Sequence, residues 1–201
     1  MAKVMMIDFE KTIGNLIETG YRPRAERIQI NVPDAREVLK RGIDYFLGRR
    51  ARWLDAYDEV ADWLTDNEGK GLLCRGTCGL GKTVICAQLM PLILNHYCRK
   101  IVPVYEAAEL GKRADEILAK HLMVIDDVGM ESPSVEYGNR RDIFSELVYK
   151  AENDGKLLII TTNLPYTGGT VNMATRYGVR TVSRLRGMVK TVTFRGEDMR
   201  G

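Results

Sequence analysis

The most constraining feature of the sequence is an eight-residue segment with the pattern GxxxxGKT, which follows the apolar run at residues 72–75 and opens a helix. The glycines of such a loop allow backbone N–H groups to turn inward around an anion, and the helix start adds the positive end of its dipole. In this pattern the lysine reaches the β- and γ-phosphates of ATP, and the threonine hydroxyl ligates Mg²⁺. The residues expected to bind nucleotide are Gly76, Thr77, Cys78, Gly79, Leu80, Gly81, Lys82, Thr83 and Val84.

A second motif places two carboxylates at the end of a buried strand. The apolar run at residues 122–125 leads directly into Asp126 and Asp127. Ligands of open α/β sheets bind at the carboxyl ends of the strands, so we expect this pair beside the phosphate loop. Asp126 and Thr83 are expected in the Mg²⁺ shell, because this hard cation prefers oxygen ligands. Asp127 is then expected to activate or orient the attacking water.

Two later segments carry polar side chains that suit the same chemistry. The apolar run at residues 157–162 ends at Asn163, whose amide is expected at the same sheet edge, near the γ-phosphate or the lytic water. Arg180 and Arg184 follow in an arginine-rich segment and share one face if that segment is helical. Such arginines stabilise the charge of phosphoryl transfer, although an exposed basic helix fits the pattern equally well.

The order of the elements indicates an α/β fold. Short apolar runs without polar alternation are typical of strands buried on both faces of a mostly parallel sheet. Helical spacing predicts helices between them, most clearly at residues 140–153, and Pro91 predicts a kink or an early end in the helix after the phosphate loop. The five strand candidates are residues 72–75, 101–105, 122–125, 157–161 and 191–194.

The domain organisation follows from these elements. We expect a three-layer P-loop NTPase domain over residues 51–201, with no separate C-terminal lid, and a small helical extension over residues 1–50. In that extension Pro33-Asp34 predicts a helix start and Gly48 its stop, with a second helix over residues 50–65. Residues 1–32 are weakly patterned, and we assign them no structure.

Composition limits the compartment and the partners. With 201 residues, 45% hydrophobic and 28% charged, the chain is typical of a globular protein. It has no membrane-spanning run and no secretory signal, which predicts a cytoplasmic protein, and its four cysteines lack zinc spacing and are expected to be reduced. Residues 171–201 carry seven basic and two acidic side chains, and this charge of +5 suits the phosphates of a nucleotide or of nucleic acid.

Residues 71–201 resemble the AAA+ ATPases of the DnaC-type helicase-loader family, which also includes the IstB-type transposition helpers. The resemblance rests on GTCGLGKT, LMVIDDVG, LLIITTNL, YGVRTVSRLRG and FRGEDMR, in that order. It implies that the first two segments are the Walker A and Walker B motifs and that Asn163 is sensor 1. It also implies that Arg184 is an arginine finger for the neighbouring subunit's nucleotide and that Arg200 is a sensor 2 arginine acting in cis. Arg180 matches an auxiliary interface arginine.

The resemblance also implies partners. Members of the family form homo-oligomers on ATP binding, bind single-stranded DNA, and place a replicative DNA helicase of the DnaB type on DNA, with slow ATP hydrolysis acting as a switch. This sequence departs from the family in two places. Residues 106–121 are short where loaders have a longer helical insertion, and the 70-residue N-terminal part contains no zinc motif and no familiar helicase-binding module.

Three other functions remain open. A transposition helper would share nearly the same ATPase core. A P-loop small-molecule kinase would need an acceptor pocket and an arginine-bearing lid within one subunit. An adaptor that binds nucleotide without hydrolysing it is disfavoured by the intact set Lys82, Thr83, Asp126 and Asp127.

Overall fold

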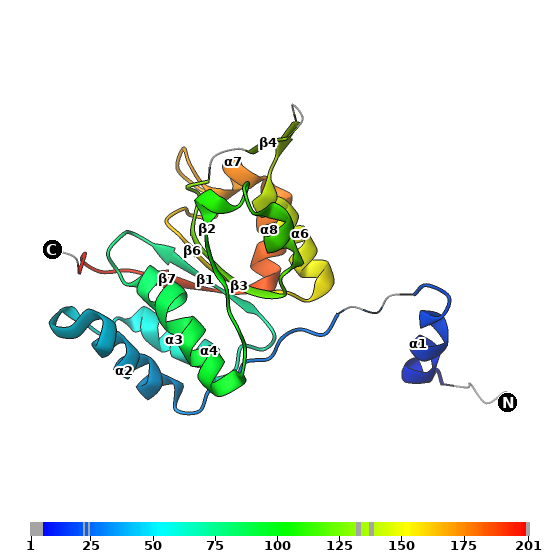
Figure 1. The fold of residues 1–201 in the computed structure, drawn as a ribbon, viewed down its shortest axis with the longest axis horizontal. Coiled ribbons are helices and arrows are strands. Elements are labelled where there is room, and N and C mark those ends of the chain that lie inside the picture. Colours follow the sequence, from blue (N-terminus) through cyan, green and yellow to red (C-terminus); the bar gives the residue numbers. More distant parts are fainter. Residues whose placement is uncertain (1–5, 22, 24, 132–133, 137–138, 200–201) are drawn as a thin grey trace.

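The computed structural model describes residues 6–21, 23, 25–131, 134–136 and 139–199. Its centre is a five-stranded sheet of order β2-β3-β6-β1-β7 in which every neighbouring pair is parallel (Figure 1). The strands are β1 (Gly71–Gly76), β2 (Val104–Glu106), β3 (Leu122–Val128), β6 (Leu157–Thr162) and β7 (Val189–Phe194). This confirms the expected α/β architecture, because a parallel sheet needs helical crossovers that cover both of its faces.

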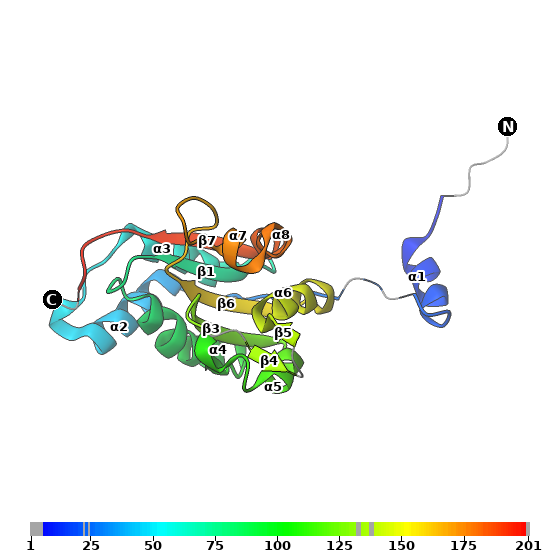
Figure 2. The ribbon, with the colours of Figure 1, turned by 90° about the horizontal axis from the view of Figure 1, so that it is seen from above.

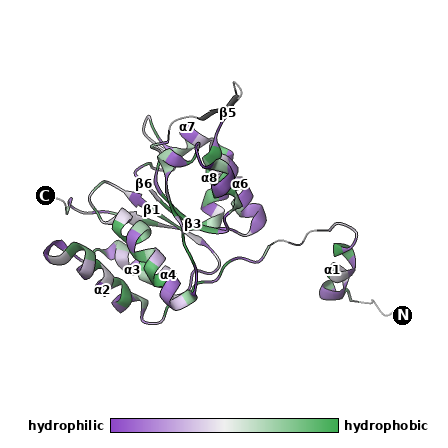
Figure 3. Ribbon diagram, in the orientation of Figure 1, coloured by the Kyte–Doolittle hydropathy of each residue, from purple (hydrophilic) through white to green (hydrophobic). Residues whose placement is uncertain are grey.

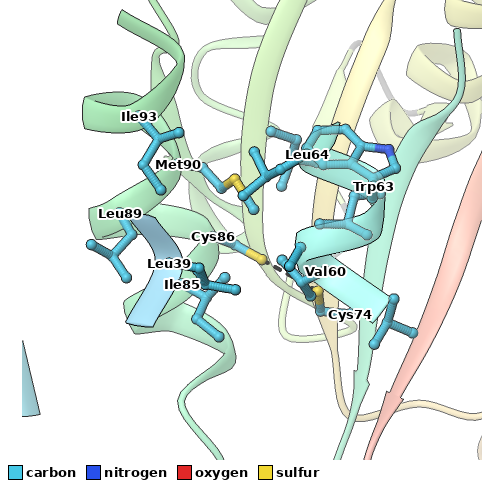
Figure 4. Close-up of a cluster of buried hydrophobic side chains, with 14 of the residues drawn as sticks. Leu39, Val60, Trp63, Leu64, Cys74, Ile85, Cys86, Leu89, Met90 and Ile93 are labelled. Carbon is cyan, nitrogen blue, oxygen red and sulfur yellow. Dashed lines mark hydrogen bonds between the residues drawn. The ribbon is translucent and has the colours of Figure 1, made fainter. Parts of the chain in front are cut away.

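Helices cover the two faces of the sheet and complete the three layers (Figure 2). Each layer has its own apolar core, and Figure 4 shows part of the one that contains Leu39, Trp63 and Ile85. One layer contains α2 (Ala35–Leu47), α3 (Asp55–Thr65) and α4 (Met90–Cys98). The other contains α5 (Ala114–Ala119), α6 (Ile143–Asp154), α7 (Met173–Tyr177) and α8 (Val179–Met188).

Several element boundaries differ from the sequence predictions. The predicted helix at residues 140–153 begins at Ile143, because the Asp142 side chain accepts a hydrogen bond from the Ser145 N–H and caps the helix there. The residues before the cap form a small antiparallel hairpin of β4 (Ser134–Glu136) and β5 (Asn139–Arg141) that the sequence did not predict. The strand expected from residue 101 begins at Val104, because Pro103 has no N–H for a ladder.

The N-terminal helices also differ in part from expectation. The start of α2 after Asp34 and its stop at Gly48 are confirmed. The helix predicted over residues 50–65 begins at Asp55 instead, and a short 3₁₀ turn, η1 (Gly48–Arg50), and extended backbone at Leu54 precede it. Gly48 has a φ of 55°, which interrupts the α-helical path between the two helices.

The helix after the phosphate loop does not end at Pro91. It begins as a π-helix, η2 (Val84–Leu89), and continues as α4, with Pro91 in the first turn of α4. The Met90 N–H bonds the Ile85 carbonyl five residues back. This wider turn lets the chain accept a residue that has no N–H to donate and whose ring would crowd a regular α-helix.

Two parts of residues 6–32, the helix α1 and the segment around Ile30, are more structured than their sequence pattern indicates. The helix α1 (Phe9–Ile17) lies apart from the domain, buries none of its residues, and carries both hydrophobic and hydrophilic side chains (Figures 1 and 3). Ile30 and Val32 instead enter the core, where the Ile30 N–H bonds Oδ1 of Asn67 at 2.8 Å. None of the described helices is long and apolar enough to cross a membrane.

Candidate nucleotide-binding site

The phosphate loop is held between α3 and the segment that follows β7. On one side, the Tyr57 hydroxyl donates to the Leu80 carbonyl at 3.1 Å. On the other side, the Met199 N–H donates to the Gly79 carbonyl at 3.0 Å. Gly79 has a φ of 79°, and a Cβ at this position would lie 1.7 Å from Oδ1 of Asp198, so the packing requires glycine here.

Lys82 crosses the loop that precedes it. Its ammonium donates to the carbonyl oxygens of Gly76 at 2.8 Å and of Thr77 at 2.6 Å, and the residue is buried. These bonds hold the loop closed on itself and keep the positive charge at the loop. The position suits the role predicted for Lys82, in which the same ammonium contacts the phosphates of a nucleotide.

Asp126 is built into a network of hydroxyl groups at the end of β3. Its Oδ1 accepts from the Thr161 hydroxyl at 2.5 Å and from the Thr83 hydroxyl at 3.3 Å. Thr161 also accepts the backbone N–H of Asp127 at 2.8 Å. One buried threonine of β6 therefore orients both aspartates, a role that the sequence analysis did not assign to it. The sequence signal that could have indicated this role was the position of Thr161, two residues before Asn163.

The backbone at Asp127 is irregular, and this directs its side chain. The pairing of β3 with β6 shifts register between Ile125 and Val128, and Asp127 has a φ of 59°. A non-glycine residue in this region is strained, and such strain concentrates at functional sites. The irregularity exposes Asp127, which lines the pocket, whereas Asp126 remains buried.

A cavity of about 280 Å³ opens against the phosphate loop. Asn163 reaches it from the end of β6, with its amide nitrogen 3.5 Å from Sγ of Cys78. The carboxyl ends of β1, β3 and β6 thus bring Lys82, Asp127 and Asn163 to one cavity. The residues that line it are Leu47, Arg50, Cys78, Gly79, Gly81, Lys82, Thr83, Val84, Asp127, Asn163 and Met199.

Two walls of this cavity come from distant parts of the chain. Leu47 and Arg50 lie at the end of α2 and in η1, and Met199 lies beyond β7. The sequence analysis missed all three, because no local pattern connects residues so far apart. Arg200, predicted to contact the nucleotide in cis, lies outside the described residues.

The arginines of α8 lie outside this cavity. Arg184 forms an ion pair with Glu152 of α6, and its guanidinium lies 4.8 Å from the centre of the Tyr149 ring. Arg180 is exposed. Neither residue lines the pocket of its own chain.

The cavity suits a nucleotide that brings its own magnesium ion. Thr83 and Asp126 supply adjacent oxygen atoms, and Mg²⁺ is commonly held by one or two protein oxygens together with phosphates and water. Among the residues that the structure describes, no group of three or more His, Cys, Asp or Glu side chains lies together as a metal site of the protein alone. The residues present therefore fit Mg²⁺ bound through phosphates.

Two cysteines pack directly beneath the loop. Cys74 of β1 and Cys86 of η2 are buried with their sulfur atoms 3.5 Å apart, and both are free thiols (Figure 4). The hydrogen bond from Cys86 to Cys74, together with burial, raises the pKa of the Cys86 thiol. A neutral thiol is the form that packs in an apolar core, so the pair acts as small apolar filling under the phosphate loop.

The parallel sheet, the phosphate loop after β1 and the acidic pair near the end of β3 define a P-loop NTPase fold. Among solved structures, the chain is similar to a crystal structure of the DnaC helicase loader, with a TM-score of 0.57 and 20% sequence identity over 78% of this chain and 99% of that chain. It is also similar to a crystal structure of DnaI, with a TM-score of 0.55 and 16% identity over 85% of this chain and 96% of that chain. No family model matches the sequence, and no curated protein is similar to it in sequence.

Proposed function

We propose that the protein is an ATP-switched helicase loader, which hydrolyses ATP slowly at the interfaces between its own subunits. The observation that carries this proposal is the position of Arg184. Lys82, Asp127 and Asn163, to which we assign binding and hydrolysis, line one cavity, but Arg184 lies outside it, on α8. An arginine finger that acts on the nucleotide of a neighbouring subunit would have such a position. The similarity of the fold to helicase-loader structures also supports the proposed loader function.

The residues of the cavity have distinct roles in this proposal. The loop N–H groups and Lys82 bind the β- and γ-phosphates, while Thr83 and Asp126 hold the Mg²⁺ ion. When bound, Mg²⁺ would neutralise part of the negative charge of the phosphates. Asp127 accepts a proton from the attacking water, and Asn163 orients that water or the γ-phosphate. Arg184 of a neighbouring subunit stabilises the charge of the transferring group, so turnover depends on assembly.

The partner of the proposed loader is a replicative DNA helicase, and α1 is the candidate docking segment. Phe9, Leu16 and Ile17 are all exposed on this helix. An amphipathic helix that buries nothing in its own chain is a common form of helix-in-groove recognition. Single-stranded DNA is the second proposed partner.

Co-elution of the full chain with the replicative helicase of its host, in ATP and again in ADP, tests the proposal. We expect a complex in ATP that Phe9→Asp with Ile17→Asp abolishes and that the exposed control Asn15→Asp retains. A complex that persists in the variant with Phe9→Asp and Ile17→Asp would exclude the apolar face of α1 as the contact. No complex in either nucleotide, with hydrolysis intact, would contradict helicase loading and favour the transposition helper.

A further inference from the structure

A cluster outside the nucleotide cavity is built around Tyr166, which lies in the segment after β6. This side chain is buried, and its hydroxyl shares a 2.6 Å hydrogen bond with the Thr191 hydroxyl of β7. Burial raises the pKa of Tyr166. The ring is therefore a fixed, neutral platform beside the edge strand of the sheet.

Two arginines from different elements lie over this ring. The guanidinium carbon of Arg75, at the end of β1, is 5.5 Å from the ring centre, and that of Arg186, on α8, is 5.3 Å from it. Nε of Arg75 also donates to the Thr193 hydroxyl at 3.0 Å. Both guanidinium groups are thus held in place, and attraction to the π-system stabilises each of them.

Among the residues that the structure describes, no carboxylate forms an ion pair with either arginine. Six arginines in the described part of the chain stack on aromatic rings, and four of these, Arg36, Arg113, Arg176 and Arg184, also form an ion pair with an acidic side chain. The two that share Tyr166 form no ion pair with any described residue. Asp55 and Glu59 line a hollow at the β7 edge with Thr191, Thr193 and Arg195, but pair with neither Arg75 nor Arg186.

Two like charges fixed on one ring favour an anion between or across them. The pair lies apart from the nucleotide cavity, whose lining includes neither arginine. Arg186 is exposed and Arg75 partly exposed, so their remaining N–H groups are open to a large ligand. Arg186 also lies in the segment that carries a charge of +5.

We propose that Arg75 and Arg186, held on Tyr166, bind backbone phosphates of single-stranded DNA. This inference rests on the proposed function and names a contact for its second partner. Arginine suits the role because its planar group donates to phosphate oxygens in a fixed geometry. The contact is to the backbone, so it is independent of base sequence.

The test measures the fluorescence anisotropy of a labelled oligothymidine that is titrated with the full-length protein in ATP, over a range of salt concentrations. The oligonucleotide has about 20 nucleotides, which exceeds the roughly 4–16 nucleotides of common single-strand binding sites. Each phosphate contact contributes roughly 0.7 to the slope of log affinity against log salt concentration. We expect Arg75→Gln and Arg186→Gln each to lower the slope by about this amount, and the double variant to lower it about twice as far. Arg75→Lys and Arg186→Lys retain the charge and should retain most of the slope.

Arg49→Gln is the matched control, because Arg49 is an exposed arginine of η1 outside the cluster. ATP affinity, measured in parallel, reports whether each variant still folds around its phosphate loop. If Arg75→Gln no longer binds ATP, the test of the proposed DNA contact depends on Arg186→Gln alone. A wild-type slope in the double variant, or in Arg186→Gln where that variant is used alone, would overturn the assignment of Arg75 and Arg186 as DNA contacts. It would leave DNA binding by the protein itself intact. A wild-type protein that binds no oligothymidine would overturn both this site and the DNA-binding part of the proposed function, whereas helicase co-elution is judged separately.

Discussion

Thr161 donates its hydroxyl proton to Oδ1 of Asp126 at 2.5 Å, and both residues are buried at the edge of the sheet where the phosphate loop begins. The same hydroxyl oxygen accepts the N–H of Asp127. The two carboxylates near the end of β3 therefore depend on one side chain of β6 for their orientation.

Replacement of Thr161 by valine tests this dependence. The variant has nearly the same shape, but it removes the shorter of the two hydroxyl bonds to Oδ1 of Asp126 and leaves the Asp127 N–H without an acceptor, at a cost of about 1–3 kcal/mol in stability. We expect ATP hydrolysis to fall at least about tenfold, which corresponds to roughly 1.4 kcal/mol in the barrier, with ATP affinity little changed. Thr161→Ser retains the hydroxyl and should retain activity. Equal losses in both variants would show that the effect does not depend on the hydroxyl, and full activity in Thr161→Val would contradict the assigned role.

Lys82→Ala should abolish ATP binding, because it removes both the charge that faces the phosphates and the two bonds that close the loop. Isothermal titration calorimetry with ATP measures the loss, which we expect to exceed about a hundredfold in affinity, or roughly 3 kcal/mol. Lys70→Ala, which alters an exposed lysine-glutamate pair, is the control. Undiminished affinity in Lys82→Ala would remove this residue from the site.

Arg184→Ala should spare ATP binding and weaken hydrolysis and assembly, since the residue does not line its own pocket. Asp127→Asn should bind ATP and fail to hydrolyse it. A mixture of the two proteins restores intact composite sites if Arg184 acts on the neighbouring subunit. The measurement is the rate of phosphate release against mixing ratio at constant total protein, and a rate that never exceeds the sum of the separate proteins would argue against a finger in trans.

Gly79→Ala should disturb the loop and the segment after β7 together. Alanine at a φ of 79° costs about 1–2 kcal/mol, and its Cβ would overlap Asp198. We expect a lower melting temperature and weaker ATP binding. Adding Asp198→Ala should relieve the overlap but not the backbone strain, so recovery should be partial. Full recovery would show that the left-handed backbone at Gly79 has no energetic importance.

The raised pKa of Tyr57 predicts a specific loss of folding stability at alkaline pH. Burial raises the pKa of Tyr57 to about 12, from 10.0 in an unperturbed side chain. The unfolded chain therefore releases this proton first, so the stabilising contribution is complete below pH 10 and declines as pH rises toward about 12. The decline should reach about 2 kcal/mol after solvent screening. Denaturant unfolding of wild type and Tyr57→Phe between pH 8 and pH 12 measures it, and parallel curves would contradict the assignment.

The features that were predicted correctly from the sequence are those encoded by contiguous residues. The phosphate loop, the strand leading to Asp126 and the helix stop at Gly48 each depend on neighbours within a few positions, and local chemistry is sufficient to place them. The role of Thr161 and the wall formed by Met199 depend on strand order and on a chain reversal, which no local pattern encodes. The start of α6 was misplaced because Asp142, which lies directly before the first apolar residue of the helix, was not recognised as its N-cap.

The hydrogen bond between the Met199 N–H and the Gly79 carbonyl joins the segment after β7 to the phosphate loop. A single bond of this kind contributes about 1 kcal/mol, a factor of roughly five in favour of the attached form, and the packing of Met199 against the core adds to it. In a detached form the nucleotide cavity would lack one of its walls. A nucleotide that contacts Met199 selects the attached form, so ATP should protect the bond after Arg195 from trypsin. Proteolysis at that one position would report occupancy of the site from the opposite end of the sequence.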